Sequence, residues 1–286
     1  MPEPQATEWE CYTDLASEQR GLLRREAPCA PDPEGIETRI RQRRNLKTTW
    51  IHVRSEQGSL ALRKPMGTYV TLELEPAAFA GWKEKARLVQ TLAGELAELM
   101  HLSPAEAVLA VGLGNRGVVY DALGPQTVEG LWITRHLQGR TPESLGPIRP
   151  VSALAPGVQG QTGMETGEIL RAIAAREKPA AVLVVDALAA RNRASLGRCI
   201  QLTDTGLAPG SAILSGRAAL TRESLGVPVY ALGVPTVSTL EAAPDYVVTH
   251  REIARQIAFF AEILSRAVNL ALHPQLTEEQ SSQFVE

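Results

Sequence analysis

Apolar and polar positions alternate along most of the chain in patterns that predict strands and helices in turn. Two stretches rich in β-branched and aromatic residues, 48–53 and 68–74, predict strands. Between residues 78 and 101, valine and leucine recur at steps of three and four positions. This spacing puts the apolar side chains on one face of a helix, so we expect an amphipathic helix there.

From residue 107 onward, short apolar runs alternate with stretches of helical periodicity. The pattern predicts strands at 107–113, 150–154, 180–185, 198–203 and 227–233, and helices at 123–137, 165–176 and 252–272. Strands as apolar as 180–185 are typical of the centre of a parallel sheet. The alternation therefore indicates an α/β fold with a mainly parallel sheet and helices on both faces. No repeat or long linker interrupts it, so a single domain is expected.

The N-terminal region, up to about residue 45, is polar and irregular, and three prolines in it break any helix. A basic cluster lies at its end, at Arg39, Arg41, Arg43 and Arg44. Runs of charge usually form solvated surface; contact with an acidic partner or with another part of the chain is the alternative. At the other end, the residues after His273 are polar and are expected to fray.

Composition and charge describe an ordinary globular protein. Hydrophobic residues make up 44% of the 286 positions and charged residues 21%, enough for one large α/β domain. The formal charge of −3 argues against a large nucleic-acid footprint, so no direct nucleic-acid partner is expected. Three cysteines without zinc-type spacing indicate a reduced, cytoplasmic setting. We see no signal-peptide pattern and no apolar run near the ~20 residues of a membrane helix, so no membrane span is expected.

Two aspartates that follow predicted strands are the best candidates for chemistry. Asp186 comes directly after the strand 180–185, so its carboxylate should emerge at a strand tip, and Asp121 lies in the loop after the strand 107–113. In an open parallel sheet, ligands bind beyond the carboxyl ends of the strands. Either residue alone could be a helix cap or a turn residue. As a close pair they could share a proton and activate water for peptide hydrolysis.

The sequence Gly112-Leu113-Gly114-Asn115 suggests a phosphate-binding loop at first sight. The third glycine of the dinucleotide fingerprint is missing, because Gly117 comes too early, and no P-loop motif occurs. A nucleotide site is therefore the weaker interpretation. The alternative is that these glycines make tight turns and let the backbone approach a substrate.

Other classes of catalytic site find little support. The five histidines are scattered without paired-ligand spacing, and no GxSxG nucleophile elbow occurs. Cys199 falls within a predicted strand and is expected in the core. No cofactor is expected, although the two aspartates could bind a hard divalent cation, which leaves a metal open.

Several longer motifs resemble those of the germination (spore) protease family, and the resemblance runs nearly end to end. The motifs are TDLASE (13–18), YVTLE (69–73), VGLGN (111–115), DALGP (121–125), ITRHL (133–137), PGVQGQTGMET (156–166), VDALAAR (185–191), APGS (208–211), GVPTV (233–237) and LALHP (270–274). The family's two essential aspartates fall on Asp121 and Asp186, the residues already selected from the strand ends. The chain is shorter than typical members, because the region after residues 233–240 is compact where the family often has an insertion.

The resemblance implies an endopeptidase that degrades small acid-soluble spore proteins during germination, in the cytoplasm of the forespore and spore core. It also implies a homotetramer, and a phosphorylase/hydrolase-like fold resembling that of hydrogenase-maturation peptidases. Those peptidases use two acids and a histidine around a metal. The segment 203–210, after the strand 198–203, offers no histidine, so a metal is less expected here.

The N-terminal motif resembles the family's own target. The family cuts its substrates after the acidic residue of a segment resembling Thr-Glu-Phe-Ala-Ser-Glu, and TDLASE at 13–18 has nearly this pattern. The resemblance therefore implies a zymogen that cleaves itself between Asp14 and Leu15, with residues 1–14 as propeptide and 15–286 as a single α/β peptidase domain. A plainer reading is that Thr13 or Asp14 begins a helix as its N-cap, and both can hold at once.

Selection of an acidic residue before the cleaved bond needs a positive partner. Arg191 or Arg193 could bind that side chain, because arginine pairs with carboxylates in bidentate geometry; a surface ion pair is the alternative. Backbone groups near Gly112, Gly114 and Asn115 could help to hold the substrate. Two rival functions stay open: a maturation-type metallopeptidase on the same fold, and a non-catalytic protein that holds a peptide in the crevice.

Overall fold

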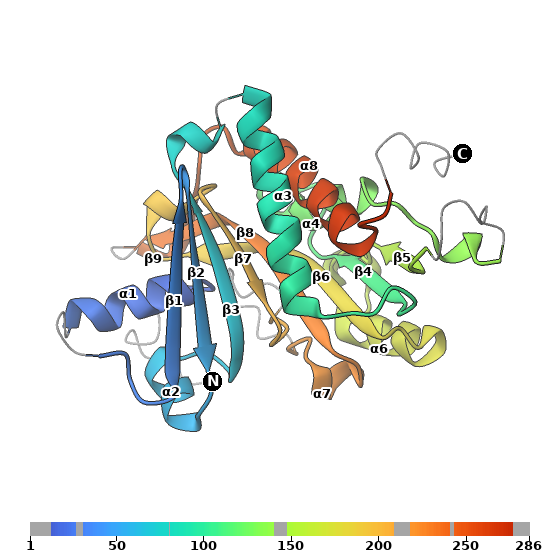
Figure 1. The fold of residues 1–286 in the computed structure, drawn as a ribbon, viewed down its shortest axis with the longest axis horizontal. Coiled ribbons are helices and arrows are strands. Elements are labelled where there is room, and N and C mark those ends of the chain that lie inside the picture. The colour runs from blue at the N-terminus through green and yellow to red at the C-terminus, as the bar shows by residue number, and fades with distance from the viewer. Residues whose placement is uncertain are drawn as a thin grey trace.

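The structure, a computed structural model, describes residues 13–26, 31–79, 81–139, 148–208, 218–240 and 243–276. Within these ranges the strands form one nine-stranded sheet, with helices packed on both of its faces (Figure 1). The predicted α/β class and the helices on both faces are therefore confirmed. The first twelve residues of the predicted propeptide and the tail from residue 277 lie outside the described part of the chain.

One half of the sheet is antiparallel. Its strands, in order across the sheet, are β1 (Ile36–Arg43), β2 (Leu46–Val53), β3 (Gly67–Leu74) and β7 (Cys199–Thr203). β7 pairs antiparallel with β3 on one side and with β8 (Val229–Leu240) on the other. The short strand β7 thus joins this half to the rest of the sheet.

The other half is parallel. After β8 come β6 (Ala181–Ala190), β4 (Val108–Gly112) and β5 (Val151–Leu154), while β9 (Ala243–Thr249) pairs antiparallel with the end of β8. Every residue of β4 is buried, and so are all but one of β6. This burial agrees with the apolar runs from which both strands were predicted.

The sheet is mixed, whereas the sequence pattern predicted a mainly parallel one. Among the described strands, only the pairs β4–β5, β4–β6 and β6–β8 are parallel. The connection from β6 to β7 runs only from residue 191 to 198. Parallel strands need a crossover connection of about a dozen residues or more, so this short connection returns β7 in the opposite direction.

Helices on one face share a large apolar core with the sheet. They are α3 (Gly81–Met100), α4 (Leu123–Glu129) and α8 (Ile253–Leu272). The opposite face carries α1 (Ala16–Glu26), α2 (Glu56–Leu62), α6 (Thr166–Glu177) and α7 (Arg222–Leu225). Short turns of helix lie in the connections: α5 (Gln159–Thr162), η2 (Pro76–Phe79), η3 (Val119–Asp121), η4 (Arg135–Leu137) and η6 (Arg193–Ser195). In the described ranges, none of the helices has both the length and the hydrophobicity that crossing a bilayer takes.

The helix predicted at 123–137 is shorter in the structure, because α4 ends at Glu129. The next residues bond to α8 instead: the Trp132 amide donates to Asn269 Oδ1 at 2.9 Å, and Asn269 Nδ2 donates to the Gly130 carbonyl at 3.0 Å. A side chain from another helix thus replaces the helical hydrogen bonds, which the periodicity of the sequence could not reveal.

The N-terminal region is more regular than its composition indicated, since it contains α1 and β1. Arg39 and Arg41 of β1 form ion pairs with Glu98 and Glu95 of α3, at 3.2 Å and 3.7 Å. The Arg39 guanidinium also lies over the Trp50 ring. Part of the basic cluster therefore contacts another part of the same chain, as the second reading of that cluster proposed.

Candidate active site

Asp121 is held by the loop that follows β4. The Leu113 amide still donates to the Val185 carbonyl of β6 at 2.9 Å, and the chain then turns at Gly114. Gly114 has φ +109°, and a Cβ there would lie 2.1 Å from the Asp121 carbonyl oxygen, so only glycine fits. The loop closes through the Asn115 amide, which donates to Asp121 Oδ2 at 2.7 Å. The carboxylate is therefore fixed next to the end of β4.

Asp186 lies inside β6, although the sequence pattern placed it just after the strand. β6 continues to Ala190 because it pairs with β8 along this length, whereas β4 on its other side ends at Gly112, opposite Val185. Asp186 is thus the first residue of β6 beyond the end of β4. It is 5% exposed, and its Oδ1 accepts a hydrogen bond from the Ala187 amide at 2.8 Å.

Both aspartates lie near the carboxyl end of β4. β4 and β6 are parallel neighbours, and neighbouring strands lie about 4.8 Å apart. The turn η3, which ends in Asp121, packs against β6 and β8. One carboxylate therefore comes from a loop and the other from a strand, and both lie in the region beyond the end of β4.

Two residues predicted to hold the substrate have partners inside the chain. The Asn115 side-chain oxygen accepts from the Gly117 amide at 2.9 Å and from Gln161 Nε2 at 2.8 Å, which ties the loop to the segment 156–166. A Cβ at Gly112 would lie 2.1 Å from the Val128 side chain, so this glycine allows α4 to pack closely on β4. Contact of either residue with a substrate stays a prediction.

The segment 13–18, which resembles the family's target, lies beside the end of β6. The Asp14 amide donates to the Ala189 carbonyl at 3.0 Å, and the Ala189 amide donates to Asp14 Oδ2 at 2.7 Å. The Thr13 hydroxyl accepts from the Leu15 amide at 3.0 Å, directly ahead of α1. The segment therefore leads into a helix, but neither Thr13 nor Asp14 is its N-cap, because α1 begins at Ala16 and Leu15 directly precedes it. The segment also bonds to β6, the strand that carries the second aspartate.

Leu15 fills an apolar pocket at this place. It is fully buried and packs with Leu188, Ala190, Leu196 and Cys199. Burial raises the pKa of the Cys199 thiol to about 12, so a thiolate nucleophile does not form there near neutral pH. The predicted core position of Cys199 is confirmed.

Glu18 anchors the other end of the segment. Its carboxylate accepts hydrogen bonds from the backbone amides of Arg191 and Asn192 at 2.8 Å and 3.2 Å, and from the hydroxyls of Ser195 and Thr13 at 2.6 Å and 2.7 Å. Hydrogen bonds to an ionised carboxylate are about twice as strong as neutral ones. The connection after β6 therefore forms a built site for one acidic side chain.

Two residues that the sequence analysis did not select hold the backbone around Asp14. Gln201 of β7 donates from Nε2 to the Asp14 carbonyl at 2.8 Å and accepts from the Ala16 amide at 2.7 Å. Lys64 Nζ donates to the Thr13 carbonyl at 2.8 Å. Burial lowers the pKa of Lys64, and two nearby carboxylates oppose this shift. A polar residue within an apolar strand was the only sequence signal for Gln201, and Lys64 had none.

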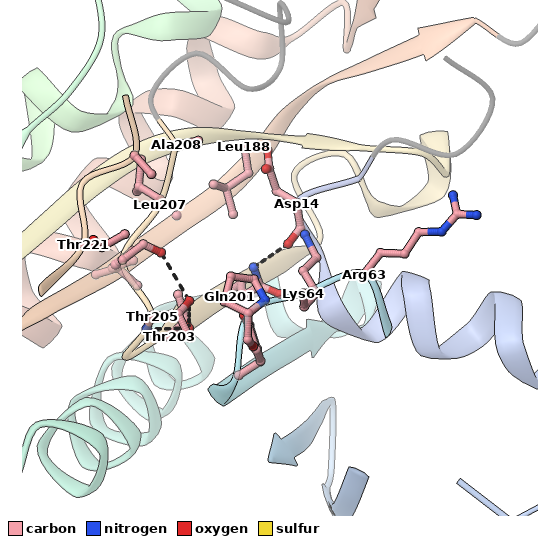
Figure 2. Close-up of a pocket in the computed structure, with 17 residues that line it drawn as sticks. Asp14, Arg63, Lys64, Leu188, Gln201, Thr203, Thr205, Leu207, Ala208 and Thr221 are labelled. Atoms are coloured by element: carbon pink, nitrogen blue, oxygen red, sulfur yellow. Dashed lines mark hydrogen bonds between the residues drawn. The ribbon is translucent and has the colours of Figure 1, made fainter. Parts of the chain in front are cut away.

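A cavity of about 210 Å³ opens beside this segment (Figure 2). Its walls include Asp14, Lys64, Gln201 and Gly233. Figure 2 shows Lys64 and Gln201 beside Asp14, whereas the side chain of Arg63 points away. The cavity therefore combines hydrogen-bond donors, one cation and space next to the bond predicted to be cleaved.

The two arginines predicted to bind an acidic side chain lie just after β6. Besides its amide bond to Glu18, the backbone of Arg191 accepts a hydrogen bond at its carbonyl from Ser238 Oγ at 3.1 Å. Arg193 is exposed. Binding of a substrate side chain by either guanidinium stays a prediction.

Metal ligation was left open by the sequence. Across the part of the chain that the structure describes, no three His, Cys, Asp or Glu side chains form a group that could hold a metal ion. Chelation experiments test whether the two aspartates bind a cation together with donors of other kinds.

Comparison with known proteins gives one consistent result. A family model described as germination protease matches residues 14–243. A germination protease of Caldanaerobacter subterraneus subsp. tengcongensis is 36% identical over 321 aligned positions, which cover 96% of this chain and 97% of that protein. The germination protease of Clostridium tetani is 39% identical over 226 positions (79% and 69% coverage), and that of Bacillus pumilus is 36% identical over 258 positions (85% and 68%). Because 321 aligned positions exceed the 286 residues here, the first relative carries residues that this chain lacks.

Proposed function

The chain belongs to the germination protease family, and from this premise we propose that it degrades small acid-soluble spore proteins during germination, using Asp121 and Asp186. Family membership makes it a hydrolase that cuts peptide bonds internally. The observation that carries the proposal is that both aspartates lie beside the end of β4, Asp121 in the following loop and Asp186 on β6, the strand that also bonds to the target-like segment 13–18.

The aspartates act on water in this proposal. When two carboxylates lie close together, one of them holds a proton, because two neighbouring negative charges are unfavourable. The ionised carboxylate takes a proton from the attacking water, and the protonated one donates to the leaving amine. No serine or cysteine nucleophile is needed.

Self-cleavage of a zymogen is the second part of the proposal. The bond between Asp14 and Leu15 is cut, residues 1–14 leave as the propeptide, and residues 15–286 remain as the peptidase domain. Support comes from two hydrogen bonds between Asp14 and Ala189 of β6, one through the Asp14 amide and one through its carboxylate, and from the position of Asp14 in the cavity wall. N-terminal sequencing after incubation at mildly acid pH checks this part; a chain that still begins at Met1 contradicts it.

Substrate binding involves the loop and the connection around the aspartates. Backbone groups at Gly112, Gly114 and Asn115 help to hold an extended, acidic substrate segment. Arg191 or Arg193 binds the acidic side chain before the cleaved bond. The connection lies against the target-like segment, where its backbone amides bond to Glu18, an acidic residue after the cleaved bond.

The test is a digest of a small acid-soluble spore protein, or of a peptide with its target segment, followed by mass spectrometry. Cleavage after the acidic residue by the wild-type chain, and none by the Asp121→Asn and Asp186→Asn chains, is expected. Intact substrate after exhaustive incubation with the wild type supports the non-catalytic peptide-binding rival. The retained aspartates and the target-like segment argue against that rival.

A metal-dependent reaction is the other rival. It predicts that a chelator abolishes cleavage and that a divalent cation restores it. In the proposal made here, no cofactor takes part, so the rate stays within about twofold of its value without chelator. The same digest therefore separates the three functions.

The proposal also covers the assembly state of the protein, its fold relationship and its location. We expect a homotetramer, a fold related to that of hydrogenase-maturation peptidases, and action in the spore core. Light scattering after size-exclusion chromatography measures the assembly, and a monomer would remove that part alone.

A further inference from the structure

Gln201 forms hydrogen bonds on both sides of the bond that self-cleavage would break. Its side-chain amide donates from Nε2 to the carbonyl oxygen of Asp14 at 2.8 Å, and its Oε1 accepts from the amide of Ala16 at 2.7 Å. The first of these groups is the carbonyl of the Asp14–Leu15 bond itself. Gln201 is only 6% exposed, so both hydrogen bonds are shielded from water.

The sheet places Gln201 in one row with Asp186. Gln201 of β7 pairs with Gly233 of β8, and Gly233 pairs with Asp186 of β6. Residues that pair across strands project their side chains to the same face, so the Gln201 and Asp186 side chains share a face. Their backbones are two strand spacings apart, about 10 Å.

Gly233, which has no side chain of its own, lies between them in the sheet. A Cβ at this position would lie 2.6 Å from the Asp186 carbonyl oxygen and 2.6 Å from the Leu188 side chain, so only glycine fits. Gly233 and Gln201 both line the cavity beside Asp14 (Figure 2). The carbonyl of Asp14 thus lies on the face of the sheet from which Asp186 projects, held by a donor two strands away from Asp186.

We propose that Gln201 is a catalytic residue, which holds the carbonyl of the cleaved bond and stabilises the negative charge that forms on its oxygen. The inference rests on the proposed self-cleavage. Water oxygen bonds to the carbonyl carbon and gives its proton to one aspartate, while the carbonyl oxygen becomes an oxyanion that accepts from Nε2. The carbon–nitrogen bond then breaks, and the Leu15 nitrogen takes a proton from the other aspartate.

Physical chemistry favours this role over simple anchoring. A preorganised donor aimed at a developing oxyanion acts more strongly in a site that excludes water, because no solvent has to reorganise. Lys64, which donates to the neighbouring Thr13 carbonyl, adds positive charge to the same region. A residue that only anchored the segment could bond to any of its polar groups, whereas Gln201 bonds to the carbonyl of the cleaved bond itself.

The experiment follows self-cleavage of the full-length chain by intact mass, in the wild type and in Gln201→Glu and Gln201→Ala. Hydrogen exchange at the Ala16 amide gives the fraction of chains in which the segment is docked. Glu at 201 can still accept from Ala16 but cannot donate to the Asp14 carbonyl. Gln42→Ala is the matched control, since Gln42 lies on β1 and its amide bonds are exposed.

The readout is the cleavage rate per docked chain. We expect Gln201→Glu and Gln201→Ala to lower it by about 100-fold or more, the size typical of losing one oxyanion donor, and Gln42→Ala to leave it unchanged. If either Gln201 variant cleaves at the wild-type rate per docked chain, Gln201 only anchors the segment and the inference is overturned. If the wild type does not cut after Asp14, or Asp186→Asn still cuts, the proposed function itself fails.

Discussion

The two halves of the sheet contribute different things to the site. The parallel half carries Asp121, in the loop after β4, and Asp186, on the neighbouring strand β6. The antiparallel half brings Gln201, from β7, and the loop between α2 and β3 brings Lys64. Both of these bond to the segment 13–18. In the proposed mechanism, the parallel half therefore supplies the acids, and the antiparallel half and its loop hold the carbonyl groups of the segment.

This division has a physical origin. Parallel strands align their carboxyl ends, so residues after neighbouring strands meet at one edge of the sheet. Antiparallel strands do not gather their ends in this way, but a strand such as β7 can be placed next to the parallel half after a short reversal. The segment 13–18 therefore bonds to both halves, to Ala189 of β6 and to Gln201 of β7.

The largest expected effect tests the chemical half. Asp121→Asn and Asp186→Asn should each slow cleavage by about a thousandfold or more, because general acid–base catalysis is lost. The double variant should be about as slow as either single variant, because the two aspartates act as a unit and their effects do not add. Rates come from mass spectrometry of the digest. Asp204→Asn at the end of β7 is the control, and a single variant with near-normal turnover would remove the division of roles.

The next effect concerns docking of the target-like segment. Leu15→Ala should lower the free energy of unfolding by about 2–5 kcal/mol, because a fully buried leucine is truncated. Leu60→Ala, at a position 79% exposed, should change it by less than about 0.5 kcal/mol. Urea unfolding is measured in the Asp186→Asn background, so that the segment is not removed. Equal effects of the two variants would mean that the segment adds nothing to the stability of the fold.

Acid should lower the free energy of unfolding through His273, which directly follows α8. Burial, helped by the positive charge of Arg149, lowers the pKa of His273 to about 4. The unfolded chain binds this proton near pH 6.5, so the stabilisation is complete above that pH and is lost as pH falls toward 4, by up to about 3 kcal/mol. Urea unfolding from pH 7 to 4.5 should show a smaller slope in His273→Leu than in the wild type or in the exposed His136→Leu. An unchanged slope would contradict the assignment.

The smallest effect tests recognition by charge. Lys64 interacts with the charge of Asp14, so it is a third candidate, besides Arg191 and Arg193, for the cation that recognises this residue. Lys64→Met should reduce the preference for an acidic residue at position 14 by about tenfold, which corresponds to about 1.4 kcal/mol of a partly screened charge interaction. The measurement compares self-cleavage of the natural chain with that of Asp14→Asn, each with and without Lys64. Lys83→Met on α3 is the matched control. If Arg191→Ala or Arg193→Ala loses the preference and Lys64→Met keeps it, an arginine of the connection after β6 recognises the acidic residue, and Lys64 does not.

Strand-end logic located both aspartates from the sequence, since apolar runs followed by an acid are visible without any fold. Their exact setting was less predictable. Asp186 lies within β6 because β8 pairs with the strand beyond residue 185, and no local pattern records the length of a neighbouring strand. In the sequence, Glu18 was only the last residue of a motif. Three of its hydrogen-bond donors, in Arg191, Asn192 and Ser195, lie more than 170 positions away in the chain, and the fourth is the Thr13 hydroxyl.

The sequence by itself determined most of the strands, the helices near 81–100, 166–177 and 253–272, the family, and the choice of the two candidate acids, because these depend on periodicity and on motifs that are local in the chain. It did not reveal α1, β1, α2 or β9. Only the tertiary structure decided that β7 runs antiparallel between β3 and β8, and therefore that Gln201 reaches the Asp14 carbonyl. The physical reason is that strand pairing joins residues far apart in sequence. Its energy depends on which partners the whole fold presents, and the residues of one strand carry no record of that choice.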